Sequence, residues 1–181
     1  MKKEERKKIE EYVKLMKWTP GDLYWKHAFM VREFALALQK KIGGDKDVIE
    51  VSAFLHDIGK TKLLAPGHEK ISAKLSKEFI KMINFDKNKI HQIIKCIKYE
   101  NFDSVEVKIL RSADSMALIM DAEGQKWYFA KILGNDKEKI LDELNKSFSE
   151  IEFDVGKELV KNTYQCLIDR IKHETPKYTP K

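Results

Sequence analysis

Residues 53–60 read Ala-Phe-Leu-His-Asp-Ile-Gly-Lys, and they place an imidazole next to a carboxylate at the end of a strongly apolar segment. Apolar residues upstream recur at helical spacing, so a helix is predicted from about 47 to His56, ending near Gly59, where the backbone can turn. An imidazole and a carboxylate at such a terminus can face one cation. Together they offer the mixed nitrogen and oxygen donors that Mn²⁺, Fe²⁺, Zn²⁺ or Ni²⁺ accept.

The apolar spacing is helical along almost all of the 181 residues. Only 8 Gly and 4 Pro interrupt it, and 43% of residues are hydrophobic, which is enough for one buried core. The sequence therefore predicts an all-α, single-domain helical bundle of about eight or nine helices. Besides the helix at 47–56, helices are expected at about 9–16, 23–38, 71–82, 90–97, 107–118, 122–133, 136–148 and 155–172.

The net charge of +6 comes mainly from dispersed lysines with interleaved glutamates. Such a balance attracts anionic substrates but gives no strong signal for nucleic-acid binding. No apolar stretch is long enough to span a membrane, and no signal peptide follows the charged residues 1–8. Cys96 and Cys166 have no CxxC partner and are expected to be buried, reduced thiols. We therefore expect a cytoplasmic protein.

Two further metal-competent side chains lie on predicted buried faces. His27 lies in the apolar stripe of the 23–38 helix, and Asp114 lies four residues after Leu110 on the apolar face of the 107–118 helix. Each has an ordinary explanation, since His27 can be a satisfied core histidine and Asp114 can pair with an arginine or lysine. Burying both together with the His56-Asp57 pair would be costly without a cation. One metal ion held between helices satisfies all of them.

The order His27, then His56-Asp57, then Asp114, on consecutive helices, resembles the HD superfamily of metal-dependent phosphohydrolases. The resemblance extends over about residues 22–120 of a single HD-type domain of 1–181. Residues 121–173 form a helical C-terminal extension, and a frayed tail is expected at 174–181. By resemblance, His27, His56, Asp57 and Asp114 are the ligands of a divalent cation, which is Mn, Fe, Zn, Ni, Co or Mg.

Some members of this superfamily bind a second metal through two more histidines. His68, in Gly-His-Glu at 67–69, matches the first of these positions. The second falls near residues 99–101, which contain no histidine, and Glu100 is the candidate oxygen ligand there. The site therefore holds one or two ions. Lys60 and Ala65 stand where the deoxynucleotide monophosphatase branch has acidic residues, which argues against a simple transfer of that activity.

The resemblance implies metal-assisted hydrolysis of a phosphoester, with a nucleotide or related phosphomonoester as the default substrate. Asp57, Lys60 and His68 are the expected catalytic residues. Lys60 and Arg111 are candidates to contact the substrate phosphate, or else surface or structural charges. Two other functions remain open: a non-catalytic module that binds a nucleotide or a protein partner, and a diiron oxygenase.

Overall fold

The apolar stripes become helices in the computed structural model, which describes residues 1–17, 19–62, 67–100 and 103–173. Within these residues there are nine α-helices, one 3₁₀ helix and no strand. The predicted all-α bundle is therefore confirmed. The elements are α1 (Lys3–Leu15), α2 (Leu23–Ile42), α3 (Lys46–Leu55), η1 (Ile58–Thr61), α4 (His68–Met82), α5 (Lys87–Ile97), α6 (Val105–Met120), α7 (Ala122–Lys131), α8 (Lys137–Glu150) and α9 (Asp154–His173).

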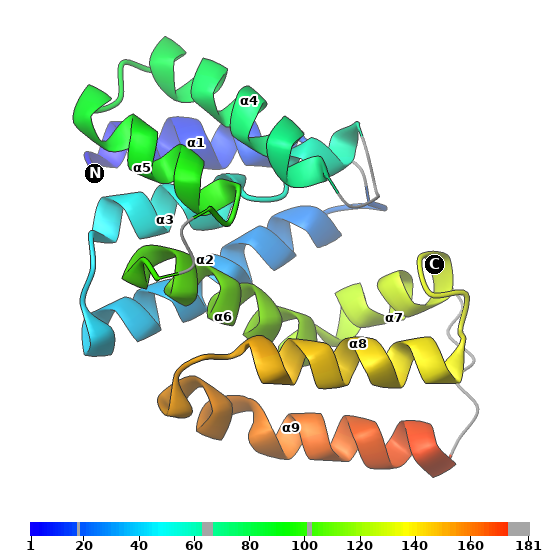
Figure 1. Ribbon diagram of the computed structural model, residues 1–181. Coiled ribbons are helices and arrows are strands. Elements are labelled where there is room, and N and C mark those ends of the chain that lie inside the picture. The colour runs from blue at the N-terminus through cyan, green and yellow to red at the C-terminus, as the bar shows by residue number, and fades with distance from the viewer. Residues whose placement is uncertain (18, 63–66, 101–102, 174–181) are drawn as a thin grey trace.

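Helix α2 lies in the middle of the molecule and packs against α3 on one side and α6 on the other (Figure 1). Helix α3 also packs against α1 and α5, whereas α6 packs against α8 and α9. Helices α1, α4 and α5 therefore lie on one side of α2, and α7, α8 and α9 lie on the other (Figure 1). This arrangement leaves α2, α3 and α6 as the elements that meet at the centre.

Helix α3 is the most deeply buried element, because every residue from Val48 to Leu55 is buried. One of these residues is charged: Glu50 is only 1% exposed. Its carboxylate accepts hydrogen bonds from Arg32 Nε at 2.7 Å and from Arg6 Nη2 at 3.1 Å. We call these three residues the Glu50 cluster. It joins α1, α2 and α3, and both carboxylate oxygens contact guanidinium groups.

Four helices, α3, α5, α7 and α8, start with an aspartate whose side chain caps the first turn. The Asp45 side chain accepts hydrogen bonds from the first turn of α3, and Asp136 does the same for α8. At the start of α2, Asp22 occupies the capping position but its side chain makes no capping bond. Instead, Thr19 Oγ1 accepts a hydrogen bond from Tyr24 N at 2.9 Å.

The outcomes of three further expectations, on the start of α4, the two cysteines and the C-terminal tail, are as follows. Helix α4 begins at His68, earlier than the apolar stripe starting near residue 71 suggested. Cys96 is buried as expected, but Cys166 is exposed because its face of α9 is turned to solvent. The expected frayed tail lies outside the described residues. Among the described helices, none combines the length and the apolarity needed to cross a membrane.

Candidate metal centre

His56 follows the last residue of α3, and its ring orientation is fixed by the backbone. Its Nδ1 lies 2.8 Å from the carbonyl oxygen of Ala53. A carbonyl oxygen only accepts, so Nδ1 carries the proton and donates it. In the neutral imidazole this leaves the Nε2 lone pair available as a ligand, which is the usual arrangement of a metal-binding histidine.

The Nε2 atom of His56 meets the other predicted ligands. It lies 3.4 Å from Asp114 Oδ1 and 3.6 Å from Asp57 Oδ2. His27 Nε2, on α2, lies 3.1 Å from Asp114 Oδ1 and 3.9 Å from Asp57 Oδ2. Ligand atoms of His27, His56 and Asp57 all lie within 4.8 Å of one another. The structure thus brings together all four residues, from α2, α6 and the turn after α3.

The surroundings of His56 Nε2 fit a cation. This atom is buried and makes no hydrogen bond to any described residue, although two carboxylates face it. Burial alone would lower the pKa of His56, but Asp57 and Asp114 outweigh burial and raise the pKa to about 9. Burial would likewise raise the pKa of Asp114, but His56 and His27 hold it well below its usual value. Two carboxylates around two imidazoles therefore favour added positive charge, which either a proton on His56 or a divalent ion can supply.

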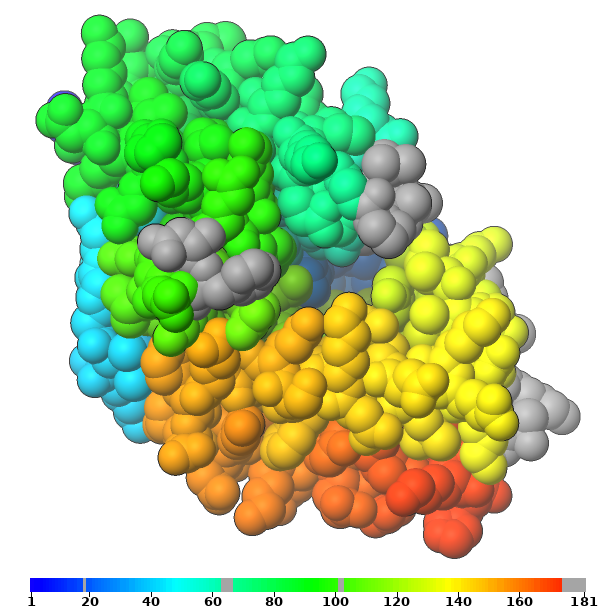
Figure 2. All heavy atoms as spheres, in the orientation of Figure 1, coloured from blue at the N-terminus to red at the C-terminus, as the bar shows by residue number. Residues whose placement is uncertain are grey.

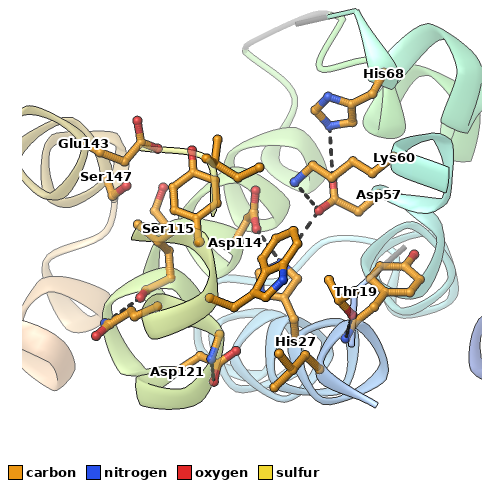
Figure 3. Close-up of a pocket in the computed structure, with 18 of the residues that line it drawn as sticks. Thr19, His27, Asp57, Lys60, His68, Asp114, Ser115, Asp121, Glu143 and Ser147 are labelled. Carbon is orange, nitrogen blue, oxygen red and sulfur yellow. Dashed lines mark hydrogen bonds and ion pairs between the residues drawn. The ribbon is translucent and has the colours of Figure 1, made fainter. Parts of the chain in front are cut away.

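Asp57 has two more partners: one contacts Oδ2, the oxygen that also faces His56, and the other contacts Oδ1. Lys60 Nζ lies 2.5 Å from Asp57 Oδ2, and His68 Nε2 lies 3.0 Å from Oδ1 (Figure 3). Burial would raise the pKa of Asp57, but Lys60 and His56 hold it far below its usual value. Asp57 therefore stays ionised and links the imidazole pair to Lys60 and His68.

Gly59 fixes how closely η1 approaches α4. Its amide donates to Ser72 Oγ at 2.8 Å. A Cβ added at Gly59 would lie 2.3 Å from the carbonyl oxygen of His68 and 2.5 Å from Ser72 N. Only glycine fits there, and the reason is this close approach rather than the backbone turn expected from the sequence. The contact holds the start of α4, and therefore His68, against the segment that carries Asp57.

The structure does not bring Glu100 to the centre. Its side chain is 54% exposed and pairs with Lys98 at 3.1 Å, and it is not among the described residues that line the adjoining pocket. Arg111 does line the pocket, but its guanidinium pairs with Glu152. Of the two predicted phosphate-binding residues, Lys60 therefore lies at the centre, whereas Arg111 lines the pocket and is paired with Glu152.

Tyr99 is a site residue that the sequence did not reveal. Its hydroxyl donates to Asp114 Oδ2 at 3.4 Å, and its ring lines the pocket. Burial, together with Asp114, raises the pKa of Tyr99 well above its usual value, so the hydroxyl stays protonated. The backbone of Tyr99 has a φ of 53°, which non-glycine residues seldom adopt. The sequence offered one signal for this residue: residues 99–101 contain no histidine, so another side chain has to occupy the place of the second histidine.

The centre opens into a pocket of about 700 Å³. Figure 2 shows the hollow, with α2 as its blue floor, between α4 on one side and α7 and α8 on the other. The centre lies at one end, with Lys60 and His68. The far end is formed by α6, α7 and α8, and its lining includes Ser115, Trp127, Tyr128, Glu143, Ser147 and Glu150.

Comparison with known proteins agrees with this geometry. The chain shares its fold with YpgQ of Bacillus subtilis, whose crystal structure was determined in complex with ADP. The TM-score is 0.69, and the match covers 94% of this chain and 93% of YpgQ, with 18% sequence identity. At that identity the likeness shows the fold alone. No match was found among curated proteins.

The family model described as HD domain matches residues 24–119, which is more than half of the chain. The matched segment contains His27, His56, Asp57 and Asp114, the four residues that converge. It ends before α7 and α8, so the far end of the pocket lies largely outside it. By this match, the chain belongs to the HD domain family.

Proposed function

We propose that the protein is a metal-dependent phosphohydrolase that acts on a phosphomonoester, preferably a nucleotide. One observation carries the proposal. The buried Nε2 of His56 has no hydrogen-bond partner among the described residues, and it faces two carboxylates at the end of an open pocket. The HD domain family includes metal-dependent phosphohydrolases, which supports this chemistry.

His27, His56, Asp57 and Asp114 would hold the cation. When bound, a divalent ion supplies Lewis acidity toward a phosphoryl oxygen and activates water near neutral pH. The two nitrogen donors favour Mn, Fe, Zn, Ni or Co over Mg, which prefers oxygen ligands. We propose a single ion, because the described residues contain one group of three converging ligand atoms and Glu100 lies apart from it.

Lys60 and His68 would act on the substrate directly. Burial would lower the pKa of Lys60, but Asp57 and Asp114 outweigh burial and raise it, so the ammonium stays charged. A fixed cation beside Asp57 can bind a phosphoryl oxygen and offset the charge that develops there. His68 Nε2 donates to Asp57 Oδ1 at 3.0 Å, and it would have to exchange that partner to donate a hydrogen bond to the same phosphate. Asp57 would orient the attacking water.

The size and walls of the pocket support a nucleotide rather than a bare phosphate. The pocket continues past the centre to Trp127 and Tyr128, whose rings offer flat surfaces for a base. YpgQ, which shares the fold, was crystallised with ADP. The diiron alternative lacks a second ligand group in the described part of the chain. A non-catalytic module would bind the nucleotide without turning it over.

The test measures metal content and hydrolysis in the same preparations. We expect one ion per chain, and hydrolysis of p-nitrophenyl phosphate and AMP in preference to a phosphodiester. Asp57→Ala should lose both the ion and the activity, whereas Asp142→Asn, an exposed change on α8, should keep both. The proposal fails if the metal-free protein cannot be reconstituted, or if Asp57→Ala hydrolyses the esters at the rate of the unchanged protein. A loaded protein without turnover would indicate the binding module.

A further inference from the structure

Helix α8 presents a polar face to the far end of the pocket. Glu143, Ser147 and Glu150 all line the pocket, and their spacing of four and then three residues places them on one side of the helix. An inward helix face is usually apolar, as at the neighbouring buried Leu144. Two carboxylates and a hydroxyl facing a cavity therefore need an explanation other than packing.

The hydroxyl of Ser147 is the first sign that this face binds a ligand. Ser147 is 5% exposed, and it makes no hydrogen bond to any residue that the structure describes. Ser147 lines the pocket, so its hydroxyl can bond to whatever fills the pocket. Figure 3 shows Ser147 beside Glu143, across the pocket from Lys60 and His68. A molecule in the pocket could hydrogen-bond to this hydroxyl.

The carboxylates define what kind of group fits. Glu143 is half-buried and has neither an ion pair nor a hydrogen bond with another described residue. Glu150 accepts only a long hydrogen bond, 3.4 Å, from Ser115 Oγ. Ionised carboxylates accept hydrogen bonds and do not donate them. Lys146 is the one basic side chain on the pocket-lining part of α8, and it is exposed.

The two ends of the pocket therefore differ in charge balance: Lys60 lies beside Asp57 and Asp114 at the centre, whereas Glu143 and Glu150 have no ion pair with a described residue at the far end. The ammonium of Lys60 lies at the centre, and the carboxylates of Glu143 and Glu150 lie at the far end. Tyr128 lines the same pocket, and burial together with Glu143 raises its pKa to about 12 while Lys60 opposes them. A ligand can thus extend from one end to the other in a continuous pocket.

We propose that the far end is a subsite for the uncharged, hydrogen-bond-donating part of a nucleoside, with Glu143 as the specificity-determining residue, so that the enzyme prefers a nucleoside monophosphate to a triphosphate. This rests on the proposed function, which assigns the phosphate to the Lys60 end. A chain of phosphates extending from that end would carry negative charge toward Glu143 and Glu150. Ribose hydroxyls or an amino group on the base would instead donate to them.

The experiment measures binding of adenosine, which has no phosphate, by calorimetry on the metal-loaded protein. Glu143→Gln should weaken adenosine binding about tenfold, the effect of one lost hydrogen bond to a charged group. Ser147→Ala should weaken it less, and Asp142→Asn on the solvent face of α8 should leave it unchanged. Thermal unfolding of each variant checks that it is folded. 2′-Deoxyadenosine and purine riboside, which lacks the amino group, distinguish hydroxyl from amino donors.

The subsite is supported if either analogue binds more weakly than adenosine and if kcat/KM is higher for AMP than for ATP. It is overturned if adenosine does not bind, if Glu143→Gln binds it as tightly as the unchanged protein, or if both analogues bind like adenosine. Equal or better turnover of ATP also overturns it. Adenosine binding does not depend on turnover. A protein that binds adenosine through Glu143 but hydrolyses no phosphoester would therefore contradict the proposed function and leave the subsite standing.

Discussion

Two charged clusters on and next to α3 are neutralised in different ways. In the middle of the helix, both oxygens of Glu50 contact guanidinium groups, from Arg6 and Arg32. At its end, His56 Nε2 faces carboxylate oxygens at 3.4 and 3.6 Å and has no hydrogen-bond partner among the described residues. The Glu50 cluster contains its own cations, whereas under the proposed function the His56 cluster would be completed by a cation from solution. The first should therefore matter for stability and the second for metal binding and catalysis.

The largest effect should follow from removing the His56 imidazole. His56→Ala deletes a ligand with no substitute nearby, so we expect loss of the ion. We also expect a fall in kcat/KM of about four orders of magnitude, which corresponds to about 5.5 kcal/mol in transition-state stabilisation. Metal analysis and p-nitrophenyl phosphate hydrolysis measure the two effects. A variant that keeps its ion would contradict the ligand assignment.

The matched change on the same helix is Glu50→Ala. It leaves Arg32, which is 12% exposed, without its buried partner and with an ion pair only to the exposed Glu33 among the described residues. Removing one member of a buried ion pair lowers the free energy of unfolding by about 3–5 kcal/mol. Urea unfolding followed by circular dichroism measures this, and the folded fraction should bind metal as the unchanged protein does. If Glu50→Ala is as stable as the parent, the two clusters do not differ as described.

Adding metal should distinguish the roles of the two clusters further, because only changes in the His56 cluster should abolish stabilisation by the ion. A ligand at 100 times its dissociation constant raises the free energy of unfolding by about 2.7 kcal/mol if it binds only the folded state. We expect Mn²⁺ to stabilise both the unchanged protein and Glu50→Ala by this amount, and His56→Ala not at all. Thermal melts with a chelator and with increasing Mn²⁺ give the comparison. Equal stabilisation of all three proteins would place the ion elsewhere.

The smallest effect should come from Tyr99→Phe, which removes the hydroxyl that donates to Asp114 at 3.4 Å. A single hydrogen bond of this kind contributes about 1 kcal/mol, or about fivefold in metal affinity. Metal titration of the variant measures it. A loss as large as that of His56→Ala would show that Tyr99 is itself a ligand.

The fold was predictable because the helices are long and amphipathic and few glycines or prolines interrupt them. The errors lie at the ends of elements, where short-range chemistry decides. Helix α4 starts at His68, preceded by Gly67 with a φ of 103°, and at the start of α2 Thr19 supplies a side-chain bond although the aspartate at position 22 occupies the capping position. Apolar periodicity carries no information about either choice.

The centre was predictable to the extent that each residue lay on a buried face. His27, the His56-Asp57 pair and Asp114 converge because α2, α3 and α6 pack together. Their role as metal ligands stays a prediction. The prediction of Glu100 as a ligand was wrong, although Glu100 lies at the expected place in the sequence. The backbone at Tyr99 is left-handed, and there Tyr99 lines the pocket while Glu100 is exposed. The far end of the pocket carried no motif, and only tertiary packing brings α8 to it.

Substitutions at Gly59 can change the distance between His68 and Asp57 in one direction only, which is to increase it. The missing side chain of Gly59 sets the separation between η1 and α4, since any added carbon would meet the backbone of His68 and Ser72. Every replacement therefore adds volume and moves His68 away from Asp57, and none draws them nearer. Selection or engineering at this position can loosen the contact between His68 and Asp57 but cannot tighten it, although glycine has no functional group of its own.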